Sequence, residues 1–201
     1  MVFIVNLTKP VILASGSPRR KELLALAGFN FTVRPANGEE VTTKTLPCDI
    51  VCELAHQKAF EIAKAQTAPC YVIGADTIVA FENRILGKPK DSADAVRMVS
   101  MLQGSTHQVY TGVTLIEVCT DGSLREKSFY EETNVHVCQM TKDEIASYVA
   151  TGEPLDKAGA YGIQGRGAVL VEKIEGCYNN VVGLPLTRLY QMMAQIGVKG
   201  F

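Results

Sequence analysis

The first segment of the chain that could do chemistry is a turn rich in small and cationic residues. An apolar run at 11–14 is followed by S-G-S-P at 15–18 and then by Arg19 and Arg20. Ser17 and Pro18 are typical of a helix start, where free N–H groups and the positive end of the helix dipole attract anions. Two guanidiniums at that end are unfavourable unless an anion such as a phosphate chain lies there. The alternative, a capped surface helix with two solvated arginines, fits this segment equally well.

A single acidic residue, Asp76, interrupts the apolar run Y-V-I-G-A-D-T-I-V-A at 71–80. A carboxylate is costly to bury unless it is paired or binds a cation. Asp76 is therefore predicted to act as a general base, a metal ligand or both. The alternative is that a neighbouring arginine or backbone N–H groups neutralise it for purely structural reasons.

Three weaker candidates are charged residues outside these two segments. Lys88 precedes Pro89, which keeps it extended and suited to contact a phosphate. The pair Glu39-Glu40 lies in a polar segment, predicted to be a mobile loop, and could bring a carboxylate to a metal. Lys58 lies on a predicted helix, off its apolar face. Each is also compatible with a solvated surface residue.

A glycine-rich segment, L-D-K-A-G-A-Y-G-I-Q-G at 155–165, is the remaining candidate. Its glycines let the backbone approach a ligand closely. The ring of Tyr161 and the amide of Gln164 are suited to stack on a base and to bond its edge. The spacing is not the dinucleotide-binding fingerprint, which needs a strand before it and a helix after it. A turn-rich loop with a buried tyrosine is the alternative.

The elements that must position these residues alternate between helical and strand patterns. Strands that require crossover connections occur together with one hairpin, which predicts a mixed sheet flanked by helices. The predicted strands are 11–14, 29–34, 71–80, 107–118, 127–137 and 168–174. Helices are predicted at 18–27, 50–65 and 185–196, and two more begin at the cap Asp91 and at the capping box 141–144. Asn179-Asn180 is predicted to lie in a loop.

Composition excludes several classes of protein. With a net charge of -1, the chain has no basic field for nucleic acid, and no apolar stretch approaches the roughly 20 residues that span a bilayer. Six scattered cysteines include no C-x-x-C pair, which favours reduced thiols in a cytoplasmic protein over a zinc site. Residues 1–6 are apolar but lack a basic n-region, so we expect no secretory signal there and instead the approach to the first strand.

Six motifs together resemble the Maf family of nucleoside triphosphate pyrophosphatases. They are A-S-G-S-P-R-R-K-E-L-L, V-I-G-A-D-T-I-V, L-G-K-P-K-D, T-G-V, E-P-L-D-K-A-G-A-Y-G-I-Q-G and N-V-V-G-L-P-L, in that order from about Ile12 to Leu186. The resemblance implies a single domain over 1–201 with an α/β fold, in which an elongated mixed β-sheet flanked by helices forms two lobes around a central cleft, as in inosine triphosphatases. It also implies a cytoplasmic protein, a homodimer, and a nucleoside triphosphate as the partner, with no nucleic acid and no membrane.

The resemblance further implies a set of site residues. Asp76, with Lys88 and Glu40, is expected to be catalytic, and Glu40 and Asp76 are expected to hold a divalent cation, Mg²⁺ or Mn²⁺. Which of Glu39 and Glu40 acts stays open, because the surrounding A-N-G-E-E-V matches the family loosely. Substrate binding is expected from Ser15, Arg19, Arg20, Lys58, Thr77 and Gln164.

Three of these residues indicate a branch of the family. Arg19, Thr77 and Gln164 look like the dTTP/UTP pyrophosphatases, whereas the 7-methyl-GTP branch carries a tryptophan in its first motif and this chain has no tryptophan. The predicted function is hydrolysis of dTTP and UTP, or of modified pyrimidine nucleotides, to the monophosphate and pyrophosphate. The alternatives are a 7-methyl-GTP or broad modified-nucleotide pyrophosphatase, and a non-catalytic nucleotide-binding regulator of cell division.

Overall fold

The computed structural model describes residues 7–196, and the chain forms two compact units within it. Unit 1 holds the residues up to Asp76, Thr111–Glu131 and the residues from Gly183 onward, and unit 2 holds Thr77–Tyr110 and Glu132–Val182. The chain thus passes between the units four times, within strands β3, β5 and β6 and after α5. The expectation of a single domain over 1–201 stays a prediction, and the expectation for residues 1–6 lies outside the described residues.

A seven-stranded sheet has the order β2-β1-β3-β5-β6-β7, with β4 paired to β3. In unit 1, β1 pairs in parallel with β2 and with β3, so that Val11 lies between Phe31 and Tyr71. In unit 2, β3 pairs antiparallel with β4, and β6 with β7. The predicted mixed α/β sheet is confirmed. The strands are Val11–Leu13 (β1), Phe31–Val33 (β2), Cys70–Phe81 (β3), Arg84–Leu86 (β4), Thr106–Val118 (β5), Leu124–Val137 (β6) and Val171–Glu175 (β7).

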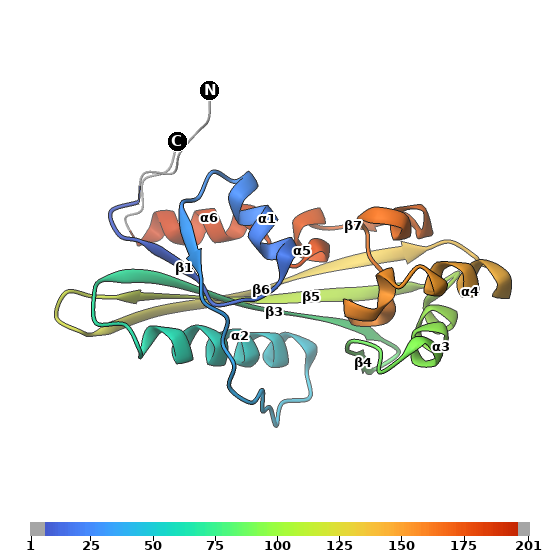
Figure 1. Cartoon of the computed structure of the whole chain (residues 1–201), viewed down its shortest axis with the longest axis horizontal. Helices are drawn as coiled ribbons and strands as arrows, with labels where there is room; N and C mark the ends of the chain where they lie inside the picture. The colour runs from blue at the N-terminus through green and yellow to red at the C-terminus, as the bar shows by residue number, and fades with distance from the viewer. Residues whose placement is uncertain (1–6, 197–201) are drawn as a thin grey trace. The chain divides into compact units, whose positions relative to one another are not determined.

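Helices cover the sheet in each unit. In unit 1, α1 and α6 lie on one side of the strands and α2 on the other (Figure 1). In unit 2, the apolar sides of α3 and α4 contribute to one core, which also includes Val135 and Tyr161. The α-helices are Pro18–Leu26 (α1), Pro47–Ala63 (α2), Ser92–Leu102 (α3), Lys142–Ala150 (α4), Tyr178–Val182 (α5) and Leu186–Gln195 (α6). No helix within residues 7–196 has both the length and the apolar character that crossing a bilayer requires.

Local sequence signals placed most helix ends correctly. Asp91 caps α3 by accepting from the Asp94 N–H at 2.8 Å, and Thr141 and Glu144 form the predicted capping box of α4. Gly28 follows α1 with φ of +77°, a conformation that glycine adopts without strain. The ends of these helices are therefore fixed by short-range hydrogen bonds and backbone freedom.

Two predictions in the last third of the chain are wrong. The strand predicted at 168–174 begins only at Val171, because the preceding residues form the 3₁₀ helix Gly165–Leu170 (η3). The predicted loop around Asn180 is α5, which that residue anchors from a fully buried position. Its side-chain amide donates to the carbonyl of Val109 at 3.0 Å and to Oγ1 of Thr133 at 2.9 Å.

Candidate active site

Asp76 lies in the buried middle of β3 and is paired with a cation. The side chain of Asp76 is 12% exposed, and its Oδ1 lies 2.6 Å from Nζ of Lys58 on α2. A glycine explains how the two meet. A Cβ on Gly74 would lie 2.3 Å from the Ala55 carbonyl oxygen, so only glycine lets α2 cross the strand this closely. Residues 74 and 76 lie on the same face of β3, which places Asp76 beside the next part of the helix.

Lys58 contacts a second carboxylate, that of Glu40. Its Nζ lies 3.0 Å from Glu40 Oε1, so one ammonium group bridges Glu40 and Asp76. Glu39, the other member of the acidic pair, instead lines a groove on the outer side of α2. The structure therefore places Glu40, and not Glu39, beside the partner of Asp76.

The turn after β1 contributes Ser15 and the two arginines. Ser15 Oγ accepts a hydrogen bond from Nη1 of Arg20 at 3.0 Å and one from the Ser17 N–H at 3.3 Å. Nε of Arg20 donates to the Gly183 carbonyl at 2.8 Å, so this guanidinium is held from two sides. Ser17 is the N-cap residue of α1 as predicted, but its side chain makes no capping hydrogen bond.

Arg20 in this turn interacts electrostatically with the carboxylates of Asp76 and Glu40. Burial lowers the pKa of the Arg20 guanidinium, Asp76 and Glu40 act to raise it, and the neighbouring Arg19 acts to lower it. Asp76 and Glu40 are thus within electrostatic reach of Arg20. Five predicted residues come together in unit 1, and we call them, with Arg19 as the chain neighbour of Arg20, the phosphate cluster: Ser15, Arg19, Arg20, Glu40, Lys58 and Asp76. Because three cations outnumber two carboxylates, the cluster suits a polyanion.

The other three predicted residues belong to unit 2. Thr77 follows Asp76 on β3 and is half-buried, and Lys88 is exposed just after β4. The Gly87 carbonyl, next to Lys88, accepts a hydrogen bond from the Gly159 N–H at 3.0 Å, which ties the lysine segment to the glycine-rich segment. Gln164 is half-buried and immediately precedes η3.

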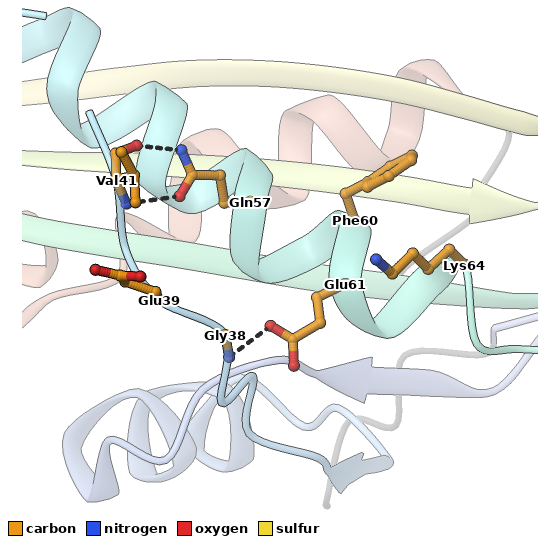
Figure 2. A pocket seen from close by; sticks show the side chains of 7 residues that line it. All are labelled: Gly38, Glu39, Val41, Gln57, Phe60, Glu61 and Lys64. Atoms are coloured by element: carbon orange, nitrogen blue, oxygen red, sulfur yellow. Dashed lines mark hydrogen bonds between the residues drawn. The ribbon is translucent and has the colours of Figure 1, made fainter. Parts of the chain in front are cut away.

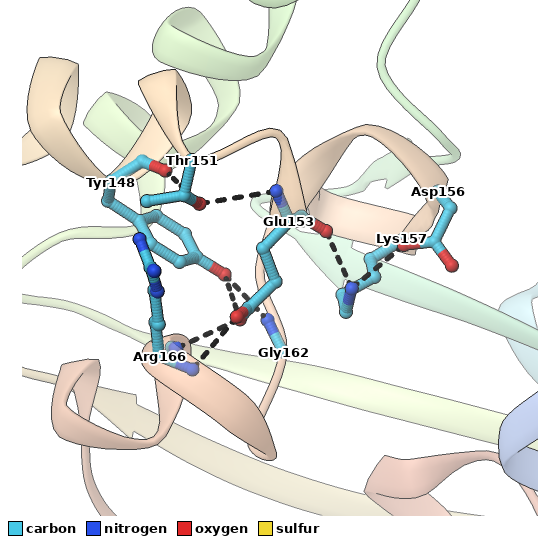
Figure 3. Close-up of polar contacts among 8 residues, drawn as sticks. Tyr148, Thr151, Glu153, Asp156, Lys157, Gly162 and Arg166 are labelled. Carbon is cyan, nitrogen blue, oxygen red and sulfur yellow. Dashed lines mark hydrogen bonds and ion pairs between the residues drawn. The ribbon is translucent and has the colours of Figure 1, made fainter.

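Glu153, a carboxylate that was not among the predicted site residues, holds the Gln164 segment. Glu153 accepts hydrogen bonds from the Arg166 and Gly167 N–H groups, at 2.8 and 2.9 Å, and from the Tyr148 hydroxyl at 3.1 Å. The Gly162 N–H in turn donates to the Tyr148 hydroxyl oxygen at 3.2 Å (Figure 3). The backbone on both sides of Gln164 is therefore tied to one Glu–Tyr pair.

Tyr161 is part of the buried core of unit 2. The residue is 7% exposed, and its hydroxyl lies 2.7 Å from Nε2 of the fully buried His107. A buried ring has no open face for a nucleobase. The interpretation of this segment as a turn-rich loop with a buried tyrosine is confirmed for Tyr161.

The carboxylates of Glu40 and Asp76 fit a divalent cation that is held jointly by the protein and by the phosphates of the substrate. Among residues 7–196 there is no group of three or more His, Cys, Asp or Glu side chains that could enclose a metal ion. Glu40 and Asp76, however, already share one cation, the Lys58 ammonium group. Mg²⁺ is typically held by one or two carboxylates together with substrate phosphates and water, so a two-carboxylate set is sufficient.

Comparisons with known proteins show the family of the chain. The family model for Maf-like proteins matches residues 10–196. A dTTP/UTP pyrophosphatase of Agathobacter rectalis is 52% identical over 200 residues, covering 94% of this chain and 98% of that protein. Proteins of the same name from Lachnoclostridium phytofermentans and Bacillus cytotoxicus are 50% and 51% identical. These matches cover 94% and 93% of this chain and 95% of each of those proteins. A solved structure of a HAM1 protein from Coxiella burnetii matches with a TM-score of 0.49 at 15% identity, covering 94% of this chain and 99% of that one.

Proposed function

Because the chain belongs to the Maf-like protein family, we propose that it is a nucleoside triphosphate pyrophosphatase that converts dTTP and UTP to the monophosphate and pyrophosphate. One observation carries the proposal: about half of the residues are identical to proteins named dTTP/UTP pyrophosphatase over nearly the whole of both chains. The phosphate cluster supports it, because Lys58 is paired with the buried carboxylate of Asp76 and Arg20 lies within its electrostatic reach.

In the proposed reaction, water attacks the α-phosphorus and the bond from that phosphorus to the bridging oxygen of the β-phosphate breaks. Asp76 takes a proton from the attacking water, and pyrophosphate leaves with the bridging oxygen. Arg19, Arg20, Lys58 and Lys88 are proposed to neutralise charge on the triphosphate and on the leaving group. Lys58 is paired with Asp76 at 2.6 Å, and we propose that it turns to the phosphates when substrate binds, which releases the carboxylate to act as a base.

A divalent cation is part of this proposal. Glu40 and Asp76 would hold Mg²⁺ or Mn²⁺ together with phosphate oxygens, and the bound cation would neutralise phosphate charge. Lys58 supports this assignment, because it shows that both carboxylates can reach the same positive charge.

Base selection is assigned to Gln164. Its amide can accept from N3–H of uracil or thymine and donate to O4. Guanine presents a similar edge at N1–H and O6, so the amide alone does not select pyrimidines and the size of the site must exclude the purine. Thr77 is proposed to contact the substrate as well.

The proposal also covers the setting of the enzyme. We propose a cytoplasmic homodimer that binds neither nucleic acid nor membrane. The six cysteines support a reducing compartment, because all of them are free thiols. Light scattering of the purified protein measures the oligomeric state.

The test is pyrophosphate release from a panel of nucleotides, with and without chelator. We expect dTTP and UTP to be cleaved fastest, and chelator to abolish turnover. Asp76→Asn should lose more than the 10²–10⁴-fold typical of general-base assistance, because it also weakens the metal site. The exposed Glu22→Gln on α1 is the matched control. Near-normal turnover of Asp76→Asn would contradict the assignment, 7-methyl-GTP as the fastest substrate would favour that branch, and no turnover of any nucleotide would favour a binding regulator.

A further inference from the structure

The outer face of α2 carries three polar side chains that form hydrogen bonds with one irregular segment, two of them with its backbone and one with a threonine side chain. Glu53, Gln57 and Glu61 are four residues apart and therefore lie along one face of the helix. Each forms hydrogen bonds with the segment 37–42, which is neither helix nor strand. We call these three side chains the α2 rail.

Glu61 fixes the beginning of the segment. Its two carboxylate oxygens accept from the backbone N–H groups of Asn37 and Gly38, both at 2.9 Å. Figure 2 shows the bond from Gly38. The absence of a side chain at residue 38 makes this possible, because a Cβ there would lie 2.7 Å from Glu61 Oε2. Glycine at this position is thus explained by the close approach of the carboxylate.

Gln57 and Glu53 fix the end of the segment. Oε1 of Gln57 accepts from the Val41 N–H at 3.2 Å, and its Nε2 donates to the Val41 carbonyl at 2.5 Å, much as a neighbouring strand would pair (Figure 2). One turn earlier on the helix, Glu53 accepts a hydrogen bond from the Thr42 hydroxyl. The backbone is therefore held both at residue 38 and at residues 41–42.

Glu40 lies between these two fixed points. Its carboxylate bonds Nζ of Lys58 at 3.0 Å, whereas Glu39 lines a groove of about 560 Å³ with Phe60 and Lys64 on the outer side of the helix. Half of the Glu40 side chain is exposed, so burial does not hold it in place. What keeps Glu40 facing Lys58 is the attachment of the backbone on either side of it.

We propose that Gln57 and Glu61 are positioning residues that keep Glu40 turned toward the metal and triphosphate. The inference rests on the proposed function, because it takes Glu40 as a ligand of the cation. It explains how an exposed segment, without helix or strand structure, can supply one member of a two-carboxylate site. It also explains why the first glutamate of the pair faces away from that site.

The experiment measures binding of Mn²⁺ by electron paramagnetic resonance in the presence of α,β-imido-dUTP, which cannot be cleaved. Glu61→Ala, Gln57→Ala and Gly38→Ala are compared with the parent protein. In Gly38→Ala the new Cβ would meet the flexible end of Glu61, so the carboxylate must move away from the backbone N–H groups while every hydrogen-bonding group of α2 is kept. We expect the dissociation constant of Mn²⁺ to rise by about 10-fold in each, as for other residues that orient a metal ligand. Glu61→Gln, which keeps one acceptor, should fall between Glu61→Ala and the parent.

Two further readouts separate positioning from a general structural effect. Amide hydrogen exchange at residues 37–41 should become faster by about 10-fold, which is the change expected when ~1.4 kcal/mol of local stability is lost. The kcat for dTTP at saturating Mn²⁺ should stay within about 3-fold of the parent, because the metal ligands themselves are unchanged. The exposed Glu22→Ala on α1 should leave all three quantities unchanged.

Several results would overturn the proposal. Unchanged exchange at 37–41 would show that the α2 rail does not hold the segment, and faster exchange with an unchanged Mn²⁺ dissociation constant would show that its order is irrelevant to the metal. An equal effect of Glu22→Ala would show that the change is not specific. A parent protein that binds Mn²⁺ but releases pyrophosphate from no nucleotide would refute the proposed function while the binding data still decide the positioning role.

Discussion

Glu153 provides a quantitative test of how the glycine-rich segment is held. Three donors converge on its carboxylate: Oε1 accepts from Tyr148 and from the Gly167 N–H, and Oε2 accepts from the Arg166 N–H. Hydrogen bonds to a charged group contribute about 1.5–3 kcal/mol each where water is excluded. Glu153 is half-buried and Arg166 is exposed, so water can replace part of this. We therefore expect Glu153→Ala to lower the free energy of unfolding by about 2–4 kcal/mol.

The glutamine variant tests the geometry more sharply than alanine does. Every partner of the carboxylate is a donor, so an amide at 153 can satisfy only the oxygen that faces Tyr148 and Gly167. Its NH₂ group would then face the Arg166 N–H, donor against donor, across a gap of about the present 2.8 Å. We expect Glu153→Gln to cost about 1–2 kcal/mol, although it is nearly the same size as glutamate.

The pH dependence of this effect follows from the pKa of Glu153. Burial acts to raise the pKa of the carboxyl, but the N–H groups of Arg166 and Gly167 outweigh it, and the net pKa is lowered. A carboxyl whose folded pKa is depressed stabilises the protein above the unfolded value of about 4.3 and loses this contribution as pH falls through the folded pKa. The difference between parent and Glu153→Gln should therefore be constant between pH 5 and 7 and shrink below about pH 4.

The assay is urea unfolding followed by circular dichroism at each pH, with Glu172→Ala as the control. Glu172 is an exposed carboxylate on β7 in the same unit, and we expect its removal to change stability by less than about 0.5 kcal/mol. If the preference for dTTP over dGTP fell in both Glu153 variants, the hydrogen bonds of Glu153 would be shown to support base selection by Gln164. If both variants unfolded at the same urea concentration as the parent at pH 7, the carboxylate would not be holding this segment.

Buried positions elsewhere give three more expected outcomes. Burial lowers the pKa of His107 to about 4, below the unfolded value of about 6.5, so the unfolded state binds the proton first as the pH falls. The free energy of unfolding should therefore rise by ~3 kcal/mol as the pH increases from 4 to 6.5, and His107→Gln should abolish this slope in unfolding experiments. Gly74→Ala should cost at least about 3 kcal/mol or prevent soluble expression, because its Cβ would meet the Ala55 carbonyl, whereas Gly87→Ala, with open space around it, should not. Asn180→Ala should cost about 2–3 kcal/mol by the same measurement, and an unchanged midpoint would contradict the role of its two buried hydrogen bonds.

The errors in the sequence-based predictions share a physical cause. Asn180 looked like a loop residue because asparagine favours turns, but two buried partners from β5 and β6 retain it inside a short helix. Gln57 and Glu61 were not singled out, because their bonds to residues 37, 38 and 41 join segments far apart in sequence. Patterns of local spacing contain no information about such contacts.

The sequence by itself determined the mixed α/β class and most of the elements, because capping and periodicity are local signals. Asp76 became a candidate as an acidic residue in an apolar run, whereas Ser15 and Thr77 became candidates only through the resemblance to the family. The sequence also indicated the family through six short motifs. Only the tertiary structure decided that Glu40 rather than Glu39 meets Lys58, and that Glu153 holds the backbone around Gln164. Both depend on which distant backbone groups a side chain can reach once the chain has packed, and that is a property of the fold.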